Sequence, residues 1–107
     1  MKHQLVLQFQ GDDSATLEKV IALEDQLIEA LEGSTAAEVD GHEAGDGVIH
    51  LSLLAKNAAR VWEKIERMVE EAASDDLEIN AVAYRDLDGE EYTVLWPQDY
   101  EGEFEMP

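Results

Sequence analysis

The order in which hydrophobic patterns change along the chain is the feature that most limits its possible folds. Residues 2–10 alternate between apolar and polar side chains, which predicts a half-buried strand. An apolar pattern of helical period follows over 14–32, after a turn in which Asp13 or Ser14 is positioned to cap the helix. A second pattern of the same period covers about 56–73. The sequence therefore predicts two amphipathic helices that are separated and flanked by strands.

The remaining apolar segments are short and predict four further strands. A weak strand of small and acidic residues covers 37–41, and the three glycines within 41–47 predict a loop after it. The segment 48–54 alternates more clearly and predicts the better strand of this pair. Two more strands are predicted over 77–86 and 91–96, with an Asp-Gly turn between them that is typical of a hairpin.

The resulting order, β-α-β-β-α-β followed by one more β, predicts the fold class. Two βαβ units in this order are typical of a ferredoxin-like α+β sandwich, an antiparallel sheet with two helices on one face. The additional C-terminal strand is expected to pair with the fourth. We expect one α+β domain over residues 1–97 and an acidic C-terminal tail over 98–107, in which Tyr100 and Phe104 are interleaved with acids.

Charge limits the classes of partner. The 107 residues contain 26 Asp and Glu against 7 Lys and Arg, which gives a net charge of −19. Nucleic acid and anionic membranes both require clustered cations, so neither is expected as a ligand. No apolar run approaches the roughly 20 residues of a membrane span, and the first residues do not form the apolar centre of a signal peptide. We expect a cytoplasmic protein.

The sequence gives little support to catalysis or to a cofactor. The chain contains no cysteine, and its four serines include no nucleophile motif. Ser52 lies two residues from His50, about 7 Å away on the same face of an extended strand, which is too far for a Ser–His pair. The acidic residues around His42 do not match the spacing of an EF-hand loop and form no repeated ligand pattern, so a solvated loop is favoured over a metal site. We therefore predict no catalytic residues, no metal site and no cofactor.

Glu24 differs from the other acids of the first helix. At about 100° per residue, Glu24 lies at the centre of a stripe of apolar residues, whereas the other helix acids lie on the polar side. The stripe comprises Leu17, Val20, Ile21, Leu27, Ile28 and Leu31. A buried carboxylate needs a partner or a raised pKa. We expect Arg85 as the partner, with Tyr84, His50 and Lys2 as alternatives, and a structural ion pair is favoured over a tuned functional acid.

Two surfaces remain as candidates for binding. The second helix carries Lys56, Arg60, Lys64 and Arg67, which predict a solvated salt-bridged face or a docking strip for an acidic partner or a second copy. The sheet face away from the helices is the other candidate. This face is expected to mix apolar and polar side chains, as interfaces do. Its expected residues are Val6, Gln8, Val48, His50, Ser52, Leu54, Val82 and Tyr84. Tyr92, Val94 and Trp96 are expected to share one face of the last strand.

Four segments, 27–31, 37–42, 83–89 and 92–97, resemble small acidic bacterial proteins, some of which are similar to immunity proteins for polymorphic toxins. The resemblance spans about residues 1–97 and consists of size, acidity and order of elements. It implies a cytoplasmic inhibitor that neutralises a cognate toxin by occluding its active site. No fixed site motif accompanies it, so no functional residue follows from the resemblance.

Three functions remain open. The first is an acidic interaction protein that binds and blocks a basic toxin or enzyme, with a partner-binding surface at Asp40, Glu43, Asp46, Tyr92 and Trp96. The second is a small-ligand or regulatory module that acts as a dimer through its open sheet. The third is an enzyme that uses Glu24 and a histidine, which we rank last. The first hypothesis allows a monomer or a homodimer.

Overall fold

The computed structural model describes residues 2–45, 47–72 and 77–96, so the tail predicted over 98–107 lies outside the described residues. The described part is an α+β fold of two helices and a five-stranded antiparallel sheet. The strands are β1 His3–Gln10, β2 Ala37–Gly45, β3 Val48–Ala55, β4 Ile79–Asp86 and β5 Thr93–Trp96, and the helices are α1 Ser14–Leu31 and α2 Ala58–Ala72.

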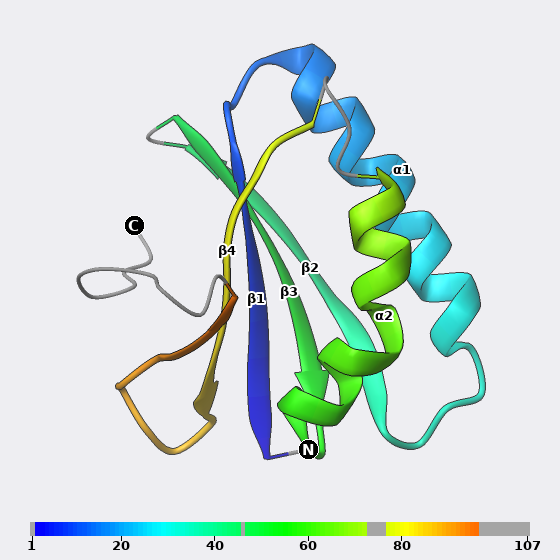
Figure 1. Ribbon diagram of the computed structural model, residues 1–107, viewed down its shortest axis with the longest axis vertical. Coiled ribbons are helices and arrows are strands. Elements are labelled where there is room, and N and C mark those ends of the chain that lie inside the picture. The colour runs from blue at the N-terminus through cyan, green and yellow to red at the C-terminus, as the bar shows by residue number, and fades with distance from the viewer. Residues whose placement is uncertain (1, 46, 73–76, 97–107) are drawn as a thin grey trace.

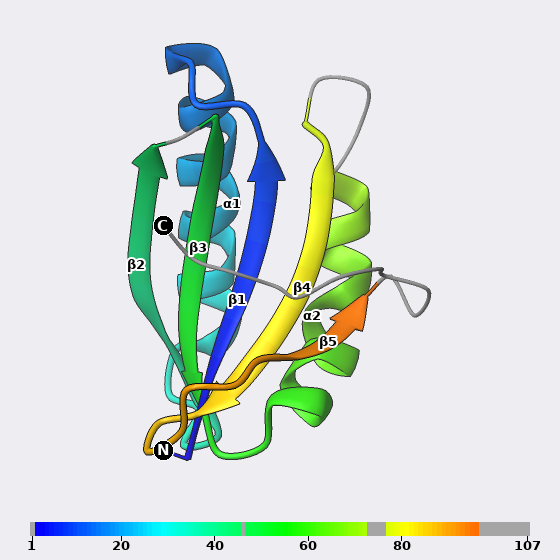
Figure 2. The same ribbon diagram turned by 90° about the vertical axis from the view of Figure 1, so that its left-hand side faces the viewer.

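The strands are ordered β2-β3-β1-β4-β5 across the sheet, and each neighbouring pair is antiparallel. Both helices cover the same face of this sheet, and neither of these two described helices lies on the other face (Figures 1 and 2). This arrangement places β2 at one edge of the sheet and β5 at the other. Neither described helix is both long enough and apolar enough to cross a membrane.

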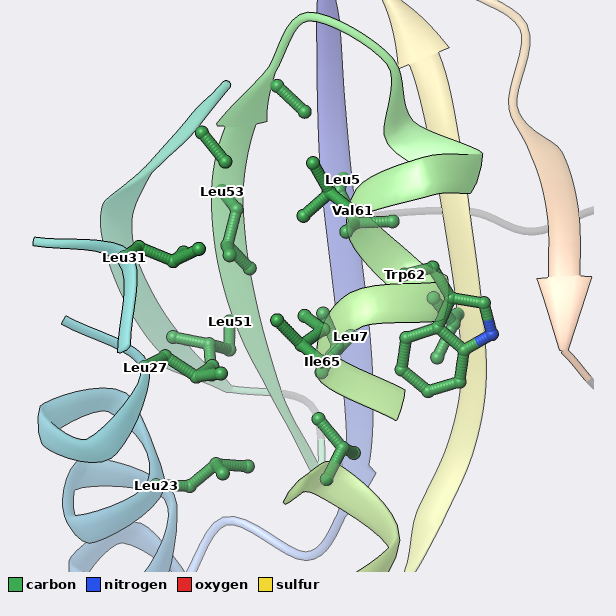
Figure 3. Packing of buried hydrophobic residues seen from close by; sticks show 14 of the residues in the cluster. Leu5, Leu7, Leu23, Leu27, Leu31, Leu51, Leu53, Val61, Trp62 and Ile65 are labelled. Carbon is green, nitrogen blue, oxygen red and sulfur yellow. The ribbon is translucent and has the colours of Figure 1, made fainter. Parts of the chain in front are cut away.

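The hydrophobic core lies between the sheet and the two helices. Leu23, Leu27 and Leu31 of α1 and Val61 and Ile65 of α2 lie on the side of Leu5 and Leu7 of β1 and Leu51 and Leu53 of β3, whereas the ring of Trp62 lies over β4 (Figure 3). Phe9, which is fully buried, continues the same row along β1. The alternation predicted for β1 and β3 therefore places their apolar residues against the helices.

Helix α1 is rotated relative to the predicted stripe. Its buried face includes Leu23, which the predicted stripe does not contain, whereas Ile21 is 36% exposed and Ile28 is 49% exposed. The buried residues Val20, Leu23, Leu27 and Leu31 are centred near 185° on the helical wheel, about 50° from the predicted centre. The prediction was wrong on this point because the apolar stripe is wider than the strip of helix that contacts the sheet.

Strand β2 is longer than predicted and replaces most of the predicted loop. It continues through 41–45 and pairs with β3 as far as Gly45 opposite Val48. The register shifts between Val39 and Gly41, which marks a bulge. Gly41 has a φ of 145°, a backbone angle that residues with a side chain rarely adopt. The glycines were interpreted as a loop, but Gly41 instead supplies the backbone freedom that this bulge requires.

Bulges also place side chains of the last two strands on a different face of the sheet from the predicted one. Val82 and Tyr84 pack on the helix side, because they pair with Leu7 and Leu5 of β1, so Ala81 and Ala83 occupy the open face instead. In β5 the register shifts so that Trp96 is opposite Val82. Trp96 therefore packs on the helix side, whereas Tyr92 and Val94 pack on the open face against Val6, Ala81 and Ala83.

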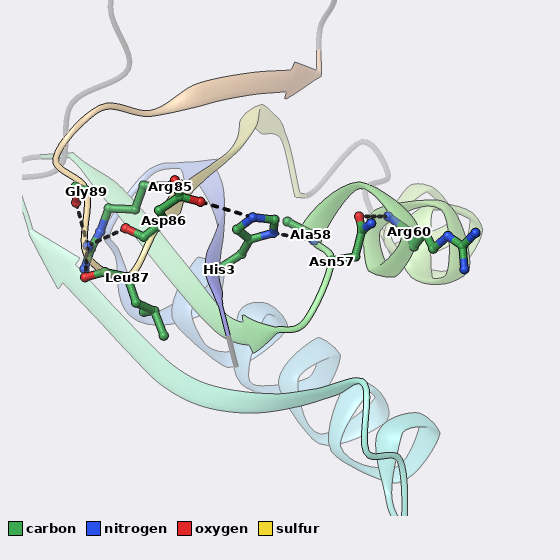
Figure 4. Close-up of polar contacts among 8 residues, drawn as sticks. All are labelled: His3, Asn57, Ala58, Arg60, Arg85, Asp86, Leu87 and Gly89. Carbon is green, nitrogen blue, oxygen red and sulfur yellow. Dashed lines mark hydrogen bonds and ion pairs between the residues drawn. The ribbon is translucent and has the colours of Figure 1, made fainter.

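A polar network holds the end of the sheet where β1, α2 and the β4–β5 connection meet (Figure 4). Nδ1 of His3 accepts a 3.0 Å hydrogen bond from the backbone N–H of Ala58, and its Nε2 lies 3.2 Å from Oδ1 of Asp86. Arg85 donates from Nε to Gln4 and from Nη1 to three backbone carbonyl oxygens of the turn, including that of Gly89 at 3.0 Å. Arg85 is therefore engaged in this turn and not with Glu24.

Candidate functional site

The predicted partner-binding residues lie far apart in the sheet. Asp40 and Glu43 belong to β2, Tyr92 precedes β5, and Trp96 ends it. Because β3, β1 and β4 separate β2 from β5, the structure does not bring the two groups together. Asp46 lies outside the described residues.

Tyr92 and Trp96 are half-buried and lie on opposite faces of the sheet. Tyr92 packs against the small cluster on the open face, and Trp96 packs against the main core. Neither aromatic lies beside the acids of β2, so they do not act as anchors next to those acids. Any anchor for a partner at β2 must come from another element.

Charge is distributed unevenly over the helix layer. Residues 14–45, which comprise α1 and β2, contain eight acids against one lysine. Residues 56–72, which contain α2, have four acids and four cations. The side chains of Lys56, Arg60, Lys64 and Arg67 are exposed, and Arg67 pairs with Glu71 at 3.7 Å. The excess of negative charge is therefore larger on α1 and β2 than on α2.

Apolar side chains accompany the acids on this side. On the helical wheel, Glu24 lies at about 240° and contacts β2, while Ile28 and Ile21 lie at about 280° and 300°, farther from the buried face. Both isoleucines therefore flank the outer edge of β2, where they are exposed. We use the name acidic edge for the outer side of β2 (Ala37–Gly45) together with Ile21 and Ile28. An apolar patch bordered by charge is typical of a protein interface.

Glu24 and His42 join α1 to β2 behind this surface. Nδ1 of His42 lies 3.2 Å from both carboxylate oxygens of Glu24, and the Glu24 side chain is 13% exposed. The partner is therefore His42 and none of the residues named from the sequence. The sequence does not identify this partner because it predicts His42 in a loop, whereas His42 lies in strand β2 next to α1. The pair fixes the position of the helix relative to the edge strand.

The Glu24–His42 contact is expected to be a modest stabiliser. In a double-mutant cycle with Glu24→Gln and His42→Gln, we expect a coupling free energy of about 0.2–1 kcal/mol at neutral pH. The contact is partly open to water, since the His42 side chain is 30% exposed. Urea unfolding of the four proteins measures this coupling. A coupling near zero would show that the pair does not hold α1 on β2.

His50 is a buried polar group on the open face of the sheet. Its exposure is 1%, and its Nε2 lies 3.0 Å from Nε2 of Gln8 on the neighbouring strand β1. Burial lowers the pKa of His50 from its ordinary value of 6.5, and the nearby carboxylate of Glu43 on β2 opposes this shift. The histidine is therefore held in its neutral form, which suits a structural side chain in the sheet.

The lowered pKa of His50 predicts a pH-dependent stability. The unfolded chain binds this proton near pH 6.5, before the folded chain does, so the stabilisation is complete above that pH and is lost as the pH falls below it. Many carboxylates titrate as well, so the test compares the wild type with His50→Gln at each pH. We expect the wild type to lose stability relative to the variant between about pH 7 and pH 5. Parallel pH profiles would contradict this account.

The described surface also has hollows, which lie beside α2 and the β4–β5 turn. A hollow of about 250 Å³ lies beside the cations of α2 and is lined by Ala36, Lys56, Asn57, Arg60, Val61 and Lys64. Two wider hollows lie at the β4–β5 turn, beside Asp86 and Gly89. Within residues 2–45, 47–72 and 77–96, no three His, Asp or Glu side chains are grouped in a way that could hold a metal ion. Leu87 is also exposed, at 39%, among the acids of the β4–β5 turn, whereas the acidic edge combines two exposed isoleucines with three exposed acids of one strand.

Comparison with known proteins adds no family to these observations. No protein-family model matches the sequence, and no curated protein matches it.

Proposed function

We propose that this chain is an acidic protein-binding domain that binds a basic protein, a toxin or an enzyme, and blocks it by occupying its cationic surface. The observation that supports this proposal most strongly is the acidic edge. Residues 14–45, which contain α1 and β2, have an excess of seven negative charges, and Ile21 and Ile28 of the same helix are exposed. Charge attracts and orients the partner, and the apolar residues supply the contact that slows its release.

We also propose a ferredoxin-like fold and a cytoplasmic location for this protein. The strand order β2-β3-β1-β4, with both helices on one face, supports a ferredoxin-like core to which β5 has been added beyond β4. The proposed role is that of a cytoplasmic inhibitor of the immunity type. Such a protein must reach its target quickly, and complementary charge can raise the association rate to about 10⁸–10⁹ M⁻¹s⁻¹ at low salt.

A capture experiment with two baits tests the proposed function. The wild-type protein and a variant with Glu38→Lys, Asp40→Lys and Glu43→Lys are immobilised, and cell extract from the source organism is applied to each. We expect a basic protein on the wild-type bait, released by about 0.5 M salt and depleted on the variant bait. Genes next to that of this chain give the first candidates.

Inhibition is then tested by expressing the captured protein with and without this chain. If the captured protein is toxic or enzymatically active alone, we expect the wild-type chain to suppress that activity and the triple variant to suppress it less. A small metabolite retained by the purified protein, with no basic protein captured, would instead favour the small-ligand hypothesis.

A further inference from the structure

The outer side of β2 offers backbone hydrogen-bonding groups to a partner. β2 pairs with β3 on one side, and no element among the described residues pairs with its other side. Strand β2 has nine residues, whereas β5 at the opposite edge has four. An unpaired edge of this length is a template for an added strand.

The register of the β2–β3 hairpin identifies the outward groups. Gly45 and Val48 face each other across a two-residue connection, which makes them a pair bonded to each other in an antiparallel hairpin. Alternate residues of β2 then direct their N–H and C=O groups away from β3. By this alternation, Ala44 and His42 direct their backbone groups to the free edge.

The charge of the edge selects the kind of strand that can join it. Glu38, Asp40 and Glu43 are exposed on β2, and the strand has no lysine or arginine. Pairing the β2 strands of two copies would bring six carboxylates together, and like charges across a strand pair are destabilising. A second copy is therefore disfavoured, and a segment with lysine or arginine is favoured.

The two faces of β2 select a pattern within that segment. Glu38 and Glu43 belong to the open face, since they pair with Leu54 and His50, whereas Val39 and the two isoleucines of the acidic edge lie on the helix side. An added strand also alternates its side chains between the two faces. Its cations would lie on the open face with the glutamates, and its apolar residues would lie on the helix side with the isoleucines.

The bulge at Gly41 limits the length of the added strand. A bulge bends its strand and increases the local twist, which protects an edge against long flat partners. The regular stretch beyond it runs from His42 to Gly45, next to the hairpin turn. A segment of about four to six residues fits this stretch.

We propose that the basic partner adds a short extended segment to the free edge of β2, with lysine or arginine alternating with apolar residues. This inference rests on the proposed function and specifies how the acidic edge would bind. The segment would place a cation over Glu43 on the open face and its apolar side chains on the helix side, where Ile21 and Ile28 are exposed.

A synthetic hexapeptide of alternating lysine and valine, blocked at both ends, serves as the probe. The matched control is the same peptide with alternate backbone nitrogens methylated on the edge that would face β2, which keeps charge and side chains but removes the N–H groups that would donate to carbonyl oxygens of β2. Titration calorimetry gives both affinities. We expect methylation to weaken binding by about tenfold or more, because main-chain hydrogen bonds provide the affinity of strand addition.

Variants at Ala44 test the same contact from the side of the protein. Ala44→Pro removes one outward N–H, a change that edge strands accept, and Ala44→Thr retains it. We expect the proline variant to bind the lysine–valine peptide about tenfold more weakly than the threonine variant, with circular dichroism to verify that both fold. Should the proline variant fail to fold, the methylated peptide provides the test.

The outcomes separate the two proposals. If the captured basic protein binds the wild type while methylation and Ala44→Pro have no effect on peptide binding, strand addition is wrong and the proposed function stands. If neither the peptide nor any basic protein binds, the proposed function is wrong.

Discussion

Leu27→Ala is expected to lower the free energy of unfolding by about 2–5 kcal/mol, whereas Ile28→Ala changes it by less than about 0.5 kcal/mol. The two residues are neighbours on α1 and both belong to the apolar stripe predicted from the sequence. Leu27 is fully buried against the sheet, so its truncation leaves a cavity, whereas Ile28 is 49% exposed. Urea unfolding measures both changes and avoids the ionic screening that guanidinium would add to a chain of charge −19.

This pair of variants separates folding from binding. Ile28→Ala should leave the fold intact and weaken the binding of the basic partner, because Ile28 belongs to the acidic edge. Similar destabilisation by the two variants would mean that the face of α1 assigned to the core is wrong.

The triple reversal Glu38→Lys, Asp40→Lys and Glu43→Lys is expected to slow association with the basic partner by about tenfold or more at low salt. These acids are exposed on β2, where they act on the approach of the partner more than on its release. Stopped-flow kinetics at about 0.05 M and 0.5 M salt measures the rate constants. At the higher salt the wild type and the variant should become similar.

A control with the same change in net charge is available elsewhere on the surface. Glu63, Glu70 and Asp88 are exposed and lie on α2 or in the β4–β5 turn. Replacing these three by lysine should slow association much less than the β2 reversal. Equal slowing by both variants would show that only the total charge matters and that β2 is not the contact.

The regular elements of this chain could be predicted because their hydrophobic periods are clear. The alternation of Leu5, Leu7 and Phe9 places β1 correctly, and α1 is observed over Ser14–Leu31 where 14–32 was predicted. The observed sheet is antiparallel with two helices, as the order of elements predicts. Local periodicity contains this information because each element buries one face.

The candidate site was harder to predict, since it depends on features that do not alter the local pattern. A bulge adds one residue and moves every later side chain to the opposite face, which is why Trp96 lies on the helix side. The rotation of α1 that exposes Ile21 depends on which strip of the helix the sheet touches. The partnership of Glu24 with His42 depends in turn on the extension of β2 beyond its bulge.

Hydrogen exchange of the complex with the captured basic protein tests the central claim most directly. The backbone amides of the free and bound chain are compared along the whole sequence, and slowed exchange marks the contact surface and the segments it stabilises. We predict protection in residues 37–45 of β2 and around Ile21 and Ile28 of α1, with little change in α2. Protection confined to α2 or to the β4–β5 turn, with unchanged exchange in β2, would contradict the assignment of the acidic edge as the binding site.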